Sequence, residues 1–161
     1  MIFITLGSQK FQFNRLLKAV DKQVAEGKIK DEIFAQIGVS DYFPQNYKFI
    51  DFLNRDEFLE WQDRADIEIT HGGTGAIVGA IKKGKKVIAI PRLKMYGEHI
   101  DDHQLQLLEQ FDELGLICVC YECDEIWMAI EIAKKTKYNV YKSNTKMIIE
   151  NIERYLDYSE K

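Results

Sequence analysis

The sequence has few prolines, few cysteines and only short apolar runs, and each of these shortages excludes something. The apolar runs, such as residues 87–90, fall far short of the roughly 20 residues that a membrane-spanning helix needs. Pro44 and Pro91 are its two prolines, and neither marks a linker or a hinge. The 161 residues are therefore interpreted as a single domain, residues 1–161.

The chain also lacks an excess of positive charge. Its 22 Lys and Arg against 26 Asp and Glu give a net charge of −4, which argues against binding to nucleic acid. No basic stretch or cleavage site precedes the strand-like run at residues 2–6, so we expect no signal peptide and a cytoplasmic location. With 46% hydrophobic and 30% charged residues, the composition is typical of a globular protein.

Three clustered cysteines, Cys118, Cys120 and Cys123, raise the question of a metal or redox site. A structural zinc site needs about four ligands, and no second cysteine pair is present. Because Cys118 and Cys120 alternate with Val119 in a strand-like run, we interpret them as small buried hydrophobic residues.

Short β-rich runs alternate with amphipathic stretches along most of the chain. Strands are predicted at residues 2–6, 32–38, 47–52, 66–70, 86–90 and 116–120, and helices at 13–24, 54–64, 74–83, 101–114 and 125–135. Strands separated by such helices indicate right-handed βαβ units. The fold class is therefore α/β, a doubly wound, mainly parallel, Rossmann-like sheet that binds its ligand at the carboxyl ends of the strands.

A further amphipathic helix is predicted near the C-terminus. Its apolar residues share one face, namely Ile148, Ile149, Ile152, Tyr155 and Leu156. Two interpretations stay open: the helix packs on its own sheet, or it docks a partner protein.

A glycine turn and a glycine-rich loop follow two of the predicted strands. Gly7 lets the backbone approach a ligand closely, and Ser8 adds a hydroxyl, although a simple turn accounts for the same residues. The second segment runs from His71 through Gly72, Gly73 and Thr74 to Gly75.

The second segment precedes a predicted helix, so its backbone N–H groups can hold phosphate oxygens, with Thr74 capping the helix or binding the anion. The Lys-Ser/Thr pair of a P-loop is missing, which disfavours ATP hydrolysis. Glycines that merely permit tight helix–strand packing are the alternative.

The third segment, residues 97–104, is dense in polar side chains. Asp102, His103 and Gln104 offer donors and acceptors of the kind that recognise sugar hydroxyls. Metal binding is possible on composition, but His99 and His103 lack the Glu arrangement of an H-E-x-x-H zinc motif, and no metal site is predicted. Helix capping with a solvated face is the alternative interpretation.

In their order along the chain, these segments resemble the C-terminal, donor-binding half of glycosyltransferase family 28. The resemblance covers the whole chain and rests on residues 7–9, 49–52, 71–75 and 102–104. It is closer still to the small stand-alone members of the family. These are soluble subunits of two-component capsule and exopolysaccharide glycosyltransferases and of the dolichol-linked N-acetylglucosaminyltransferase.

The resemblance implies half of a GT-B fold that binds a UDP-sugar without a cofactor or an essential metal. It places Gly7 and Ser8 by the nucleotide, and the backbone of Phe52 and Leu53 opposite uracil. It places Gly72, Gly73 and Thr74 at the diphosphate. The sugar is assigned to Asp102, His103 and Gln104. His71 is a weak catalytic candidate near the phosphates. The ribose-binding Glu of larger relatives falls on Gly79, and Glu98 is the substitute that we consider.

The hypothesis is a soluble, donor-binding subunit of a heterodimeric, inverting hexosyltransferase. It would transfer a hexose, galactose preferred or else N-acetylglucosamine, from a UDP-sugar to a lipid-linked saccharide in surface polysaccharide synthesis. A membrane-anchored partner would bind the acceptor and recruit the chain to the inner face of the membrane. The alternatives are a non-catalytic enhancer of a partner transferase and a nucleotide-binding regulator.

Overall fold

The computed structural model describes residues 1–143, which form a parallel sheet of six strands in the order β3-β2-β1-β4-β5-β6. The strands are β1 (Ile2–Thr5), β2 (Ile33–Gln36), β3 (Lys48–Ile50), β4 (Ile67–His71), β5 (Lys86–Ile90) and β6 (Cys118–Val119). The helices are α1 (Asn14–Ala25), α2 (Arg55–Arg64), α3 (Thr74–Lys82), α4 (His103–Glu113) and α5 (Ile126–Lys135), with 3-10 turns η1 (Lys94–Tyr96) and η2 (Cys123–Glu125). The predicted α/β class is confirmed.

Local sequence explains where several elements begin and end. The Asn54 side chain accepts a hydrogen bond from the Glu57 N–H, and the Glu57 carboxylate accepts one from the Asn54 N–H, so α2 begins with a capping box. Gly27 follows α1 with a φ of 71°, a backbone conformation that glycine adopts without strain.

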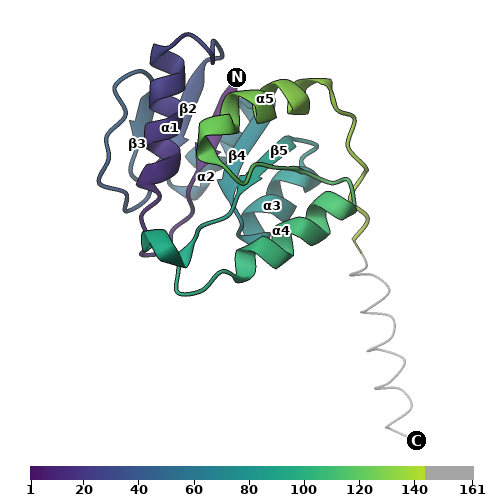
Figure 1. Ribbon diagram of the computed structural model, residues 1–161. Helices are drawn as coiled ribbons and strands as arrows, with labels where there is room; N and C mark the ends of the chain where they lie inside the picture. Colours follow the sequence, from purple (N-terminus) through teal and green to yellow (C-terminus); the bar gives the residue numbers. More distant parts are fainter. Residues whose placement is uncertain (144–161) are drawn as a thin grey trace, which may run out of the picture.

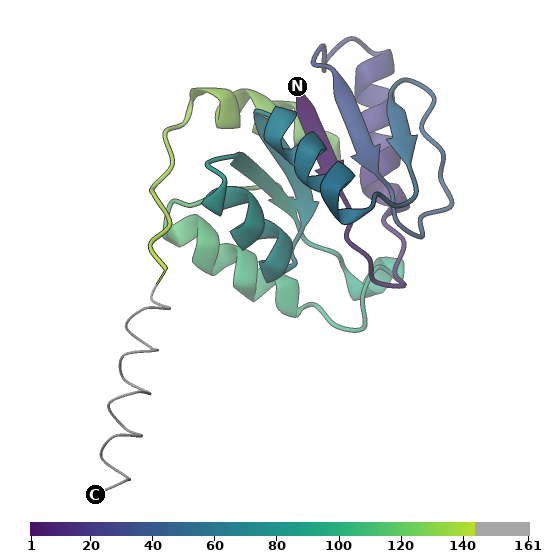
Figure 2. The same ribbon diagram turned by 180° about the vertical axis from the view of Figure 1, so that it is seen from behind.

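The helices cover both faces of the sheet. Figure 1 shows α1 and α5 together on one face, and Figure 2 shows α2 and α3 on the other, with α4 beside α3. Strand residues alternate between the two faces, so Ile88 packs with the α1 and α5 cluster whereas Val87 packs with the α3 and α4 cluster. Burial on both faces explains the apolar strand sequences.

The strand order reverses between β1 and β4, which are hydrogen-bonded neighbours. In doubly wound sheets, ligands bind outside the carboxyl ends of the strands at such a reversal. Here the chain leaves β1 at Gly7 and leaves β4 at Gly72, so two of the predicted glycine segments meet at this place.

Some predicted boundaries differ from the structure. The strand expected at 116–120 is reduced to Cys118–Val119, and the helix expected from Asp101 begins at His103. The cysteine interpretation holds for Cys120, which is buried like Cys123, and burial raises the pKa of each of these two thiols to about 12. Cys118 is only partly buried. The predicted C-terminal helix lies outside the described residues. Within residues 1–143, no helix has the length and apolar character needed to cross a membrane.

Candidate functional site

The imidazole of His71 is the centre around which the two glycine segments pack. A Cβ atom on Gly7 would lie 2.7 Å from His71 Cε1, and one on Gly73 would collide with His71 Nε2. Gly7 also has a φ of 71°, which disfavours any side chain there. Gly7 and Gly73 are therefore needed for close packing around His71. For Gly73 this agrees with the alternative interpretation of the second segment, in which glycines permit tight packing.

Some backbone N–H groups of the His71–Gly75 segment have hydrogen-bond acceptors within the protein, and others do not. Gly73 N–H donates to the His71 carbonyl oxygen at 2.8 Å, and Gly72 N–H donates to Gln104 Oε1 at 3.2 Å. The N-cap of α3 is Gly73 and not Thr74, and no side chain caps the helix. The N–H groups of Thr74, Gly75 and Ala76 therefore begin α3 without intrahelical acceptors.

At this first turn Thr74 and Gly75 are exposed, Ala76 is partly exposed, and the Cβ position of Gly75 meets open space. Together with the positive end of the helix dipole, their N–H groups can bind an anion such as a phosphate. The N–H groups of Gly72 and Gly73, which were predicted to hold the diphosphate, have internal acceptors, whereas those of the first turn of α3 have none within the helix.

Gln104 braces this loop from the first turn of α4. Its Oε1 accepts hydrogen bonds from the N–H of Gly72 and from the N–H of Arg92, at 3.2 and 3.0 Å. The side chain is buried, so its oxygen connects the ends of β4 and β5 inside the protein. Gln104 was predicted to contact the sugar, but its Oε1 accepts hydrogen bonds from the loop backbone instead.

Arg92, which belongs to none of the three predicted segments, lies buried beside the same loops. It is 1% exposed, its Nη2 donates to the Leu6 carbonyl oxygen at 2.7 Å, and its guanidinium lies over the Phe13 ring. Burial lowers the pKa of Arg92 to about 10, which still leaves it protonated at neutral pH. In the sequence, the feature that could have pointed to Arg92 is a charged residue placed just beyond an apolar strand and Pro91.

His71 is neutral at physiological pH. Burial, reinforced by the positive charge of Arg92, lowers the pKa of His71 to about 4. A buried imidazole of this pKa is a poor general base at pH 7. The geometry gives His71 a packing role under Gly7 and Gly73.

The predicted uracil-facing segment lies next to the Gly7 turn. A Cβ atom on Gly38 would lie 3.0 Å from the Gly7 carbonyl oxygen and 4.0 Å from the Phe52 ring. Phe52 is 47% exposed and available to a ligand. The Leu53 N–H is not, since it donates to Gln36 Oε1 at 3.0 Å.

Three more predicted residues are exposed: Ser8 after β1, and Asp102 and His103 at the start of α4. Asp102 Oδ1 accepts from the Lys94 N–H at 2.8 Å, which fixes the loop around η1. The loops after β1 and β5 also meet directly, because Gln12 Nε2 donates to the Tyr96 carbonyl oxygen at 3.0 Å. Figure 1 shows these two loops side by side at one end of the sheet.

Glu98 and Gly79 were considered for ribose recognition. Glu98 is fully buried, and its carboxylate accepts from Arg15 at 2.9 and 3.1 Å and from the Leu93 N–H at 3.0 Å. Gly79 is exposed on α3 with open space at its Cβ position. The Glu98 carboxylate is thus committed to internal partners, and the ribose contact has no assigned side chain.

One groove on the described surface lies away from the glycine loops. A groove of about 580 Å³ is lined by α1 residues such as Lys18 and Lys22, and by Tyr96 and Glu122. The face around Thr74 and Gly75 is open to solvent. A ligand bound to that face would contact this chain on one side and stay open to solvent on the other.

Comparisons with known proteins show what the chain is similar to. The family described as "Glycosyltransferase family 28 C-terminal domain" matches residues 1–155. The chain is 31% identical over 90 residues to the UDP-N-acetylglucosamine transferase subunit ALG13 of Candida glabrata, covering 55% of this chain and 42% of that protein. It is 25% identical over 128 residues to the human protein of the same name, covering 74% of this chain and 11% of that one. The chain thus spans less than half the length of these curated relatives.

Solved structures share the fold. MurG of Acinetobacter baumannii matches 95% of this chain and 49% of its own, with a TM-score of 0.60 and 16% identity. The solution structure of ALG13 matches 85% of this chain and 86% of its own, with a TM-score of 0.54 and 18% identity.

Proposed function

Because this chain belongs to the glycosyltransferase family 28 C-terminal domain family, we propose that it is the donor-binding subunit of a two-component glycosyltransferase. In this proposal the chain binds a UDP-sugar at the carboxyl ends of β1 and β4. A membrane-anchored partner binds the lipid-linked saccharide acceptor and recruits this chain to the inner, cytoplasmic face of the membrane.

One observation carries the proposal: the first turn of α3 presents free N–H groups at an open face of the topological reversal. Thr74, Gly75 and Ala76 begin the helix there, and Gly7 and Gly73 pack against the same His71 ring. The exposed Phe52 ring lies near Gly38, which adjoins the Gly7 turn. This order suits a diphosphate at the helix and a nucleoside toward Phe52. The buried charge of Arg92 adds positive potential beneath these loops.

The same arrangement supports inverting transfer. An acceptor hydroxyl attacks the anomeric carbon, a new C–O bond forms, and the bond to the UDP oxygen breaks with its electron pair on UDP. The N–H groups and the helix dipole stabilise the negative charge that develops on the leaving diphosphate. In this proposal the proton of the acceptor hydroxyl is transferred to a group other than His71, because the low pKa of His71 makes it a weak base. We therefore propose that the partner supplies the general base.

The sugar and the pathway are narrower parts of the proposal. The two relatives are named as subunits of a UDP-N-acetylglucosamine transferase, which favours N-acetylglucosamine over galactose as the first donor to test. The exposed His103 and Asp102 are the side chains proposed to contact the sugar. A role in capsule or exopolysaccharide synthesis, and docking through residues 148–156, remain predictions of the sequence.

Reconstitution tests the two-component proposal. Membranes from cells deleted for this chain are incubated with a lipid-linked acceptor and with radiolabelled UDP-N-acetylglucosamine or UDP-galactose. We expect transfer with one donor when the purified chain is added, and none from the chain or the membranes alone. Robust transfer by the chain alone would refute the need for a partner. Residual transfer by the deleted membranes, merely increased by the chain, would support the enhancer alternative.

A further inference from the structure

A group of three side chains at the end of the η1 loop carries an inference about metal binding, and it shares His103 with the proposed donor-sugar site. His99, Asp101 and His103 each offer one ligand atom, and these atoms all lie within 4.8 Å of one another. Asp101 Oδ1 lies 3.1 Å from His99 Nδ1 and also contacts His103 Nδ1. We propose that these three residues form a binding site for one divalent transition-metal ion of the zinc type.

The spacing of the ligand atoms suits such an ion. Tetrahedral zinc with bonds of about 2.0–2.1 Å places neighbouring ligand atoms about 3.3 Å apart. The separation of 3.1 Å between Asp101 Oδ1 and His99 Nδ1 is close to that value. The contact between Asp101 Oδ1 and His103 Nδ1 is shorter than that value, so the His103 ring would move away from Asp101 when both bind one ion.

Hydrogen bonds within the group hold its ligand atoms together. The Asp101 carboxylate accepts from the His103 N–H at 3.2 Å and lies 3.1 Å from His99 Nδ1. A metal ion bound to Nδ1 and Oδ1 would take the place of the proton that these two atoms share, so ion binding should release protons.

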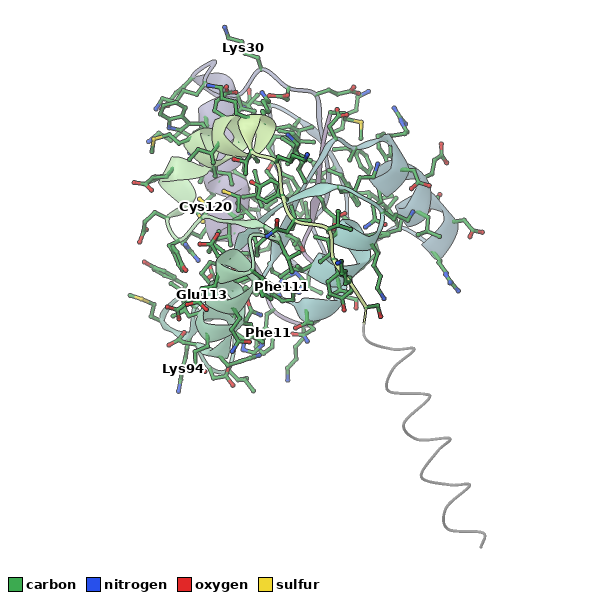
Figure 3. All side chains as sticks on the ribbon, turned by 90° about the vertical axis from the view of Figure 1, so that its right-hand side faces the viewer. Phe11, Lys30, Lys94, Phe111, Glu113 and Cys120 are labelled. Carbon is green, nitrogen blue, oxygen red and sulfur yellow. The ribbon has the colours of Figure 1, made fainter. Side chains whose placement is uncertain are left out.

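The loop that holds these residues is braced, so the ligands are brought together before any ion binds. The Asp102 carboxylate accepts from the Lys94 N–H, and the buried Glu98 carboxylate accepts from the Leu93 N–H. His99 is only 8% exposed and its ring packs on that of Phe11, with 5.2 Å between the ring centroids. Figure 3 shows Phe11 and Lys94 at the same end of the molecule, opposite Lys30.

The ligand types select the metal. Two imidazoles and one carboxylate suit zinc, cobalt, nickel or copper, whereas magnesium and calcium prefer oxygen ligands. Asp101 and His103 are 53% and 51% exposed, so the ion is reachable from solvent and keeps a position for water. The partial positive charge at the N-terminus of α4 repels a cation bound there, and the negative carboxylates of Asp101 and Asp102 offset this repulsion.

Titration of the purified full chain with Zn²⁺ by calorimetry tests the site. We expect one saturable ion per chain, and affinity at least about tenfold weaker in each of His99→Ala, Asp101→Asn and His103→Ala. Glu109→Gln, an exposed carboxylate on the same helix, is the matched control and should bind as the unaltered chain does. Equal affinity in all four variants, or no binding to the unaltered chain, would overturn the proposal.

Cobalt distinguishes this site from the three free cysteines, Cys118, Cys120 and Cys123, whose sulfur atoms can also bind a metal ion. The Co²⁺ complex should show d–d absorption without a sulfur-to-cobalt charge-transfer band, and it should disappear in His103→Ala. Since His103 is exposed, this variant should keep the circular dichroism spectrum of the unaltered chain. A charge-transfer band would place the ion at the cysteines and contradict the proposal. Mg²⁺ at the same concentration should give no heat.

Discussion

His71 occupies the space that a side chain on Gly73 would need: a Cβ atom there would collide with His71 Nε2. The first substitution to make is therefore Gly73→Ala. Overpacking of this kind costs about 1–3 kcal/mol, so we expect the free energy of unfolding to fall by that amount and UDP binding to weaken. Urea denaturation and calorimetry measure the two effects.

Gly79→Ala is the matched control on the same helix. Nothing lies within 4 Å of its Cβ position, and alanine favours the helix over glycine by about 0.5–1 kcal/mol. We expect Gly79→Ala to raise the free energy of unfolding. Equal destabilisation by both substitutions would show that the packing around His71 is not the cause.

Gln104→Leu tests the brace between β4 and β5. The substitution leaves the N–H groups of Gly72 and Arg92 without their acceptor, and each unpaired buried group costs about 1–3 kcal/mol. We expect a lower free energy of unfolding and faster amide hydrogen exchange at Gly72 and Arg92. Gln106→Leu, exposed on the same helix, should change neither. Unaltered exchange at both amides in Gln104→Leu would contradict the assigned hydrogen bonds.

Glu68 makes stability depend on pH. It is fully buried on β4, only its Oε2 accepts a hydrogen bond, from Gln62, and burial raises its pKa from 4.5 to about 7. Because the folded-state pKa is the higher one, the contribution of Glu68 is most favourable below about pH 4.5. It is lost as the pH rises through about 7.

Glu68→Gln removes this ionisation and is nearly the same size. We expect the variant to be more stable than the unaltered chain at pH 8, by an amount on the order of 3 kcal/mol, and to lose this advantage at pH 5. Urea denaturation at both pH values measures it. A difference between the two proteins that stays constant with pH would rule out ionisation of Glu68 as the source.

His71 should remain neutral well below pH 6. Its folded-state pKa of about 4 lies below the ordinary 6.5, so its contribution to stability is present above pH 6.5 and is lost as the pH falls toward 4. Imidazole NMR signals followed from pH 8 to pH 5 should show no protonation of His71. A midpoint near 6.5 would mean that the ring is not buried against Arg92 as described.

The sequence predicts much of the fold because local signals agree with it. Apolar strand runs and the Asn54 cap are local features, and the structure confirms the parallel α/β sheet and the capping box of α2. The glycine loops were also predicted, since clustered glycines between a strand and a helix indicate a tight turn that a side chain would obstruct.

The brace and the charges of the site were not predicted, because they depend on the order of the strands. Gln104 meets Gly72 and Arg92 only when β4 and β5 are neighbours with α4 beneath their ends. Likewise, the pairing of Glu98 with Arg15 joins residues 83 positions apart, so its burial could not be read from its own segment. The predicted cap at Thr74 moved to Gly73 because the Gly73 carbonyl oxygen accepts the first hydrogen bond of the helix, from the Ile77 N–H at 3.2 Å.

An NMR titration with UDP tests the central claim most directly. With the amide signals of the chain assigned, UDP is added to millimolar concentration and each signal is followed. We predict saturable shifts with one binding constant at Gly7 and at Thr74, Gly75 and Ala76, the first turn of α3. No saturable shift at these amides, or saturable shifts confined to another part of the molecule, would contradict a UDP-sugar site at this end of the sheet.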